Sequence, residues 1–211
     1  MEVERHSDIA IIGTGPVALF SVFQLGLFGL TCRLFDSASR AGGQCTALYA
    51  DKPIFDVPAF AKIMGEELIE RLLTQIEPYK PAFEFDQLVI DVSASENGIQ
   101  LKTVSGTSFS SKCLVIASGL GAFTSEGQIV RPDPLGTFDL QRFGNSIVVN
   151  TETFCTSQPK IYAIGDVCHY PGKLKLILSG FHEAALMTQA IGKICNKLNR
   201  PWRYWVIFSS R

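Results

Sequence analysis

The stretch "DIAIIGTGPVALFSVFQLGLFGLTCRLFD", residues 8–36, decides the expected fold. An apolar run over residues 8–12 meets a glycine, and the apolar period then becomes helical over residues 16–28. A second apolar run, residues 31–35, follows and ends at an aspartate. Strand, helix and strand at this spacing predict a βαβ unit, the building block of a parallel sheet.

The turn "GTGPVA" inside this unit has the pattern G-x-G-x-x-A. Gly13 allows the tight turn, Gly15 lets a pyrophosphate approach the backbone, and Ala18 is small enough for close packing of the helix on the strand. Asp36 stands 21 residues after Gly15, where a carboxylate accepts hydrogen bonds from ribose hydroxyls and repels a 2′-phosphate. The unit therefore predicts a dinucleotide site that does not hold NADP. The alternatives are an incidental glycine turn and an aspartate that only ends the strand.

The rest of the chain indicates that it leaves this sheet and returns. We expect an amphipathic helix over residues 59–76, an antiparallel meander over 83–109, a buried strand over 112–119, a connector over 124–145, further strands at 146–150 and 159–166, and a helix over 180–198. The buried strands near residues 112 and 161 are typical of the first, parallel sheet. The predicted fold is therefore α/β, Rossmann-like, with a parallel sheet, a small antiparallel meander and flanking helices.

Composition excludes several classes of protein. The chain has 211 residues, 46% of them hydrophobic, and a formal net charge of −1, with no basic stripe for nucleic acid and no polybasic membrane segment. The first residues carry no apolar signal core, so we expect a cytoplasmic protein without a membrane partner. Six scattered cysteines without metal-ligand spacing predict buried free thiols and no metal site.

Two further segments carry ligand-binding chemistry. The loop over residues 40–60 offers Gly43 for close approach of a flat ligand, Gln44 as donor and acceptor, and the ring of Tyr49. The run "IYAIGD" brings Asp166 to the carboxyl end of a strand, where ligands of open α/β sheets bind. The helix that follows would point its positive end at the same place.

The combination of "IIGTGPVALF", "GGQCTALYADKPIFDVPAF", "VIASGLGAF" and "YAIGDVCHYPGKLKLILSGFHEAA" closely resembles the thioredoxin-reductase-like ferredoxin-NADP reductases. The resemblance implies that the first dinucleotide site holds FAD. It places Thr14 at the phosphates, Asp36 at the adenosine ribose, Gln44 and Tyr49 along the flavin, Val89 near the adenine, Phe123 and Ser210 near the flavin ring, and Asp166 at the ribityl chain. The expected FAD-binding set is completed by Gly13, Gly15, Pro16 and Gly43, and no residue is assigned to catalysis.

The sequence departs from the family where a second dinucleotide domain, for NADP, would be inserted. Only about 22 residues, 124–145, fill this gap, too few for a βαβ unit of roughly thirty residues or more. We therefore expect an FAD-binding domain in two segments, residues 1–123 and 146–211, joined by a short connector. Because a nicotinamide must be held against the flavin in a defined geometry, NADPH-dependent turnover by this chain alone is not expected.

Function and partners follow from this arrangement. We expect a flavoprotein that transfers electrons through FAD, with ferredoxin or flavodoxin as partner, no nucleic acid or membrane partner, and a homodimer formed through an apolar flavin face. Two alternatives stay open: a non-catalytic FAD-binding or interaction module, and a complete small NAD(P)-binding protein.

His182 is either a proton relay or a packed or capping residue. Lys173 and Lys175 either meet an acidic electron carrier or are simply solvated.

Overall fold

The computed structural model describes residues 5–123, 129–130 and 139–195 of the chain, and of Ala122, Phe123, Ile129 and Val130 only the backbone. The helices are α1 (Pro16–Leu27), α2 (Gln44–Ala47), α3 (Gly65–Ile76) and α4 (Ile177–Ile194), with 3₁₀ turns η1 (Glu77–Tyr79) and η2 (Gly165–Val167). The strands are β1 (His6–Ile12), β2 (Cys32–Phe35), β3 (Pro53–Ile54), β4 (Ile63–Met64), β5 (Ala82–Glu84), β6 (Val89–Ser95), β7 (Gly98–Thr103), β8 (Ser108–Ile116), β9 (Ala122–Phe123), β10 (Ile129–Val130), β11 (Arg142–Phe143), β12 (Ser146–Val148), β13 (Ile161–Ala163) and β14 (Cys168–His169).

The main sheet joins the parallel part and the meander through one long strand. Its order is β5-β2-β1-β8-β7-β6, and β13 also pairs with β8. The pairs β5·β2, β2·β1, β1·β8 and β8·β13 are parallel, whereas β6·β7 and β7·β8 are antiparallel. The first half of β8 pairs with β7 and its second half with β13, in the register Ile161 opposite Leu114. This confirms the predicted Rossmann-like α/β fold with a small meander.

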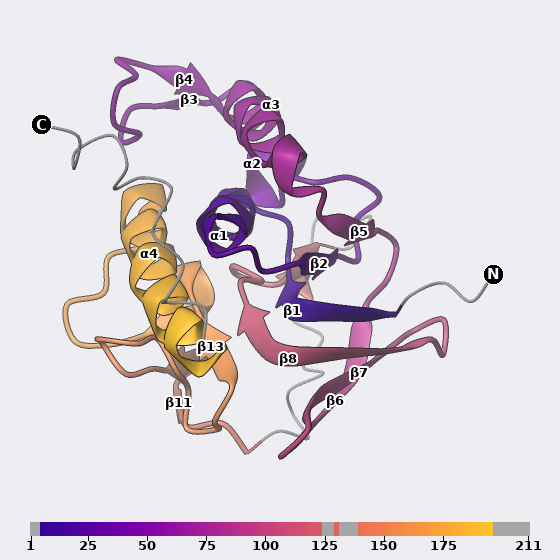
Figure 1. Ribbon diagram of the computed structural model, residues 1–211. Helices are drawn as coiled ribbons and strands as arrows, with labels where there is room; N and C mark the ends of the chain where they lie inside the picture. The colour runs from indigo at the N-terminus through magenta and orange to yellow at the C-terminus, as the bar shows by residue number, and fades with distance from the viewer. Residues whose placement is uncertain (1–4, 124–128, 131–138, 196–211) are drawn as a thin grey trace, which may run out of the picture.

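The helices form a layer beside the parallel strands. Figure 1 shows α1 lying between α3 and α4, and α1 contacts both neighbours. The core is built from β1, β2, β8 and β13, whose apolar residues are almost fully buried, and from the inner face of the helices. Within the described part of the chain, no helix combines the length and the apolar character that crossing a bilayer requires.

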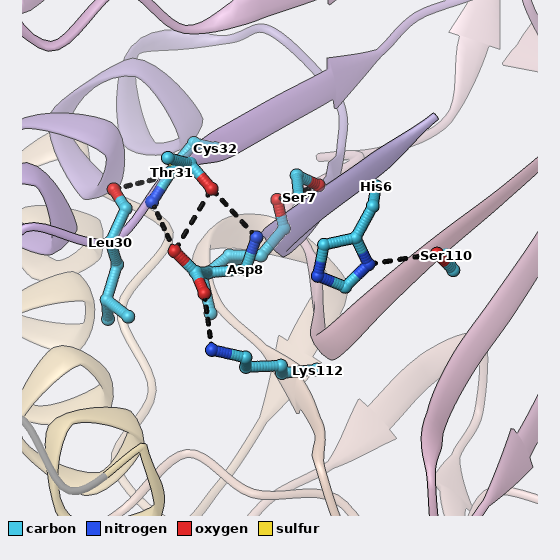
Figure 2. A network of polar contacts seen from close by, with 9 residues as sticks. His6, Ser7, Asp8, Leu30, Thr31, Cys32, Ser110 and Lys112 are labelled. Carbon is cyan, nitrogen blue, oxygen red and sulfur yellow. Dashed lines mark hydrogen bonds and ion pairs between the residues drawn. The ribbon is translucent and has the colours of Figure 1, made fainter. Parts of the chain in front are cut away.

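The amino ends of these strands are tied together by a polar network (Figure 2). The carboxylate of Asp8 on β1 accepts hydrogen bonds from the backbone N–H of Thr31, at 2.9 Å, and from its hydroxyl, at 3.0 Å. It also pairs with the Lys112 ammonium on β8, at 2.6 Å. The network thus fixes β1, β2 and β8 at the edge of the sheet remote from their carboxyl ends.

Several predicted boundaries were wrong. The helix expected over residues 59–76 begins at Gly65, because Ala59 has φ +73° and residues 63–64 form a hairpin with residues 53–54. Phe83, expected in the meander, lies in β5 and pairs in parallel with β2. The last helix starts at Ile177 and not at Gly180.

Candidate cofactor site

A cavity of about 1440 Å³ opens at the carboxyl ends of the parallel strands β1, β2, β8 and β13. Ten of the twelve predicted cofactor residues line it: Gly13, Thr14, Gly15, Pro16, Asp36, Gly43, Gln44, Tyr49, Val89 and Asp166. Of the other two, Phe123 lies in β9 with only its backbone described, and Ser210 lies outside the described residues. Segments far apart in the sequence therefore meet at one cavity, as ligand sites of open α/β sheets do.

The two glycines of the first turn have different tasks. Gly13 has φ +108°, and a Cβ there would lie 2.5 Å from the carbonyl oxygen of Ala117 at the end of β8. A Cβ on Gly15 would meet no protein atom within 4 Å. Gly13 is thus required by the fold, whereas Gly15 leaves open space on the cavity side. Since Pro16 opens α1 there, the free N–H groups of the helix border the same space.

Asp36 binds the turn directly. Its carboxylate accepts hydrogen bonds from the backbone N–H of Thr14 at 2.9 Å, from the Thr14 hydroxyl at 2.6 Å and from the N–H of Ala38 at 3.0 Å. The Thr14 hydroxyl therefore faces Asp36, while Thr14 itself lines the cavity. A carboxylate has about four acceptor sites, so one remains here for a ribose hydroxyl.

The segment after β5 forms the wall beside Asp36. Gln87, Leu88 and Val89 line the cavity, and the Gln87 N–H donates to the Asp36 carbonyl at 2.9 Å. The side-chain oxygen of Gln87 is buried and has no hydrogen-bond partner among the described residues. An unpartnered buried acceptor costs roughly 1–3 kcal/mol. This oxygen is closed off from the open space of the cavity, so its cost falls on the wall and a ligand does not contact it.

The loop after β2 forms the opposite part of the cavity. A Cβ on Gly43 would lie 3.4 Å from the Cα of Gly15, so this loop passes close to the first turn. Gln44 begins α2 and Tyr49, 39% exposed, follows it. The Lys52 ammonium lies 4.7 Å from the centre of the Tyr49 ring. One ring face of Tyr49 is thus engaged by a cation, which sequence reasoning did not foresee.

The returning part of the chain closes the cavity. β13 leads into η2, which carries Asp166, and α4 begins at Ile177, which also lines the cavity. Gly180 allows this approach, because a Cβ there would lie 2.3 Å from a methyl carbon of Val17 on α1. The N-terminal ends of α1 and α4 are therefore packed against each other beside the cavity.

Two single-residue expectations have a clear outcome, and one residue was missed. Lys173, expected on a solvated or partner-binding loop, is 5% exposed and paired with the fully buried Glu183, because the loop folds back onto α4. His182 is exposed and does not line the cavity. The missed residue is Glu183. Glu183 lies on the same face of α4 as Met187 and Ile191. An acidic residue within this apolar stripe was the feature of the sequence that could have identified it.

The cysteines are free thiols, as predicted. Burial raises the pKa of Cys45, which lines the cavity, to about 11, so this thiol stays protonated at neutral pH. In the residues that the structure describes, no cluster of three or more His, Cys, Asp or Glu side chains is arranged to hold a metal ion. The chemistry of the cavity thus comes from backbone N–H groups, carboxylates, amides and a few cations.

The fold and the cavity together define a dinucleotide-binding α/β protein. No family model matches the chain. It is similar to the ferredoxin--NADP reductase of Parvibaculum lavamentivorans, with 29% identity over 313 aligned positions, 90% of this chain and 91% of the relative. It is 35% identical to that of Rickettsia felis over 192 residues, 91% of this chain and 52% of the relative. The predicted resemblance to ferredoxin-NADP reductases is confirmed.

Solved structures share the fold at low sequence identity. The thioredoxin reductase of T. acidophilum superposes with a TM-score of 0.77 and 13% identity, over 92% of this chain and 100% of that one. A ferredoxin-flavin thioredoxin reductase from Clostridium acetobutylicum gives 0.73 and 16%, over 90% and 99%. The chain spans about half the length of the Rickettsia relative.

Proposed function

We propose that this chain binds FAD in the cavity and acts as an electron-transfer flavoprotein that holds no NADPH of its own. The gathering of ten predicted residues on one cavity carries the proposal. FAD would supply the electron-accepting ring, and the chain would supply its position and electrostatic surroundings.

The cavity suits FAD along its whole length. Asp36, Gln87 and Val89 would border the adenosine end, where one carboxylate site is free to bind it. The open space at Gly15 and the N–H groups of α1 suit the pyrophosphate. Gln44, Tyr49 and Asp166 would border the ribityl chain and the ring, with Phe123 and Ser210 as further candidates near the ring.

The absence of an NADPH site rests on the segment between β9 and β12. We propose that residues 1–123 and 146–211 form one FAD-binding domain and that residues 124–145 are a connector. In support, the alignment with the Parvibaculum relative runs over 313 positions, although the chain has only 211 residues. At least 102 positions of that relative (313 − 211) therefore face a gap here.

Ferredoxin or flavodoxin is the proposed electron-transfer partner, since the curated relatives are named for ferredoxin.

A homodimer is the proposed assembly. Phe55, 68% exposed, and Leu176, 43% exposed, both line the cavity and leave apolar surface at its rim. A second copy that covers this rim would remove the apolar surface from water.

Titration with FAD, followed by an anaerobic test of donors, examines the proposal. We expect quenching of FAD fluorescence at one site per chain, slow reduction by NADPH at the rate of free flavin, and faster reduction by reduced ferredoxin. A chain that does not bind FAD contradicts the proposed cofactor. Rapid bleaching by NADPH contradicts the proposed absence of a nicotinamide site.

The second candidate function is a non-catalytic FAD-binding module. The same gap favours it, because a flavin without a held hydride donor has no built-in source of electrons. The two functions differ in one measurement. Bound flavin that reduced ferredoxin reduces no faster than free flavin indicates the module, and faster reduction indicates the electron-transfer protein.

A further inference from the structure

We propose that Glu183 is the positioning residue for the flavin end of the cavity. Its buried carboxylate fixes the loop over residues 165–176, so that the cavity-facing side of this loop keeps one shape. The inference rests on the proposed function, because it assigns Glu183 a task in holding the flavin half of FAD.

Four donors from this one loop converge on the carboxylate. The Gly165 N–H donates to Oε2 at 2.6 Å. The single proton of the Cys168 thiol is shared between the same oxygen, at 3.6 Å, and the Gly165 carbonyl oxygen, at 3.2 Å. The Tyr170 hydroxyl donates to Oε1 at 2.8 Å, and the Lys173 ammonium pairs with the same oxygen. Each carboxylate oxygen therefore holds two points of the loop.

The loop faces the cavity on its other side. Gly165, Asp166 and Val167 line the cavity at its beginning, and Lys175 and Leu176 at its end. Gly165 takes part on both sides, because its N–H binds Glu183 while its neighbour Asp166 borders the cavity. A substitution of Glu183 would thus disturb Gly165, which is the immediate neighbour of Asp166, the residue expected at the ribityl chain.

The burial of the Glu183–Lys173 ion pair indicates that it fixes the conformation of the loop more than it adds to the stability of the chain. The Glu183 side chain is fully buried and that of Lys173 is 5% exposed. A buried ion pair contributes little net stability compared with apolar residues of the same volume, yet breaking it is strongly destabilising. Such a pair specifies one conformation of the loop. An apolar contact in its place would let the loop shift.

The protonation of the neighbouring donors agrees with this arrangement. Burial raises the pKa of Cys168 to about 12, and the Glu183 charge contributes in the same direction. Burial and the hydrogen bond to Glu183 likewise raise the pKa of Tyr170. Both groups therefore keep their protons at neutral pH and continue to donate to the carboxylate.

The test compares ligands that occupy different ends of the cavity. Glu183→Gln keeps the side-chain volume but places an NH₂ group where an oxygen accepts from two donors, so one contact becomes repulsive. We expect the affinity for FAD and FMN to fall at least about tenfold, as loss of an outer-shell contact does. Affinity for ADP, which reaches only the adenosine end at Asp36 and Val89, should stay within about twofold.

Two further variants keep the test decisive. Tyr170→Phe removes one donor without changing shape, and should weaken FMN binding in the same direction even where Glu183→Gln fails to fold. Glu84→Gln is the matched control, because Glu84 also forms a partly buried ion pair, with Arg33, but lies on β5 away from the loop. It should lower stability without changing the ratio of FMN to ADP affinity.

The outcomes separate the two proposals. A wild-type chain that binds no FAD contradicts the proposed function and the role of Glu183 together. A wild-type chain that binds FAD, with Glu183→Gln and Tyr170→Phe binding FMN equally well, overturns the role of Glu183 alone. Equal losses of ADP and FMN affinity in folded Glu183→Gln also overturn it, because they indicate a general structural effect.

Discussion

Alanine substitutions at the two glycines of the first turn should separate the fold from ligand binding. Gly13→Ala would bring a Cβ to 2.5 Å from the carbonyl oxygen of Ala117, at a φ of +108°. The backbone conformation costs a non-glycine residue about 1–3 kcal/mol, and overpacking against a neighbour costs about 1–3 kcal/mol more. Loss of roughly 2–6 kcal/mol is a large fraction of the ~5–15 kcal/mol that stabilise a folded domain.

Gly15→Ala should behave in the opposite way. Its Cβ meets nothing within 4 Å and its φ is −69°, so the free chain should lose only about 0.5–1 kcal/mol, the cost of replacing Gly by Ala, a poorer N-cap residue. The same Cβ occupies the space through which a pyrophosphate reaches the backbone. Overpacking there of about 1–3 kcal/mol lowers FAD affinity by roughly tenfold to a hundredfold.

Urea unfolding without ligand and FAD titration measure the two effects separately. Gly106→Ala is the control for backbone strain alone, because Gly106 has φ +81°, open space around it and a place in the turn between β7 and β8. Gly13→Ala should lower the unfolding free energy by more than Gly106→Ala. The reasoning is refuted if Gly15→Ala destabilises the free chain as much as Gly13→Ala, or if it binds FAD as tightly as the wild type.

Two more predictions concern the network at the amino ends of the strands and the unpaired amide oxygen of Gln87. Burial alone would raise the pKa of Asp8, but its contacts with Lys112 and Thr31 outweigh burial and lower it. The stabilisation by the Asp8 carboxylate is therefore complete above the unfolded pKa of about 3.9 and is lost at lower pH. Asp8→Asn should cost about 1 kcal/mol at pH 7 and nearly nothing near pH 2 in urea unfolding. Gln87→Met should raise the unfolding free energy of the free chain by about 1 kcal/mol, because it removes a buried oxygen without a partner among the described residues; an unchanged or lower unfolding free energy contradicts this assignment.

The sequence was sufficient to predict those parts of the fold that depend on short-range patterns of apolar residues and glycines. The strand, glycine turn and helix of the first unit lie where the apolar periods place them, and the dinucleotide cavity follows from their order. The helix expected from Ala59 failed because apolar spacing alone does not separate a helix from a short hairpin before it. Its true start at Gly65 depends on backbone contacts with Tyr49 and Cys45, which no local pattern records.

The site was predicted less completely than the fold, for a physical reason. Residues such as Asp36 and Asp166 occur at fixed places relative to strand ends, so the βαβ rules locate them. Glu183 and Lys173 become partners only because a loop turns back onto α4. The apolar stripe around Glu183 marks the acid in the sequence, but no local pattern indicates that Lys173 pairs with it. The orientation of Thr14 toward Asp36 is likewise a tertiary fact.

The way the chain returns to the sheet explains how residues far apart in the sequence come to share one cavity. The second half of β8 is held by β1 on one side and by β13 on the other. The N-terminal end of α4 packs on α1 at the contact between Gly180 and Val17. The predicted cavity residues before β9 and the one on η2 are therefore joined through β8 and α1, and Arg142 and Asn145 line the same cavity from the segment before β12.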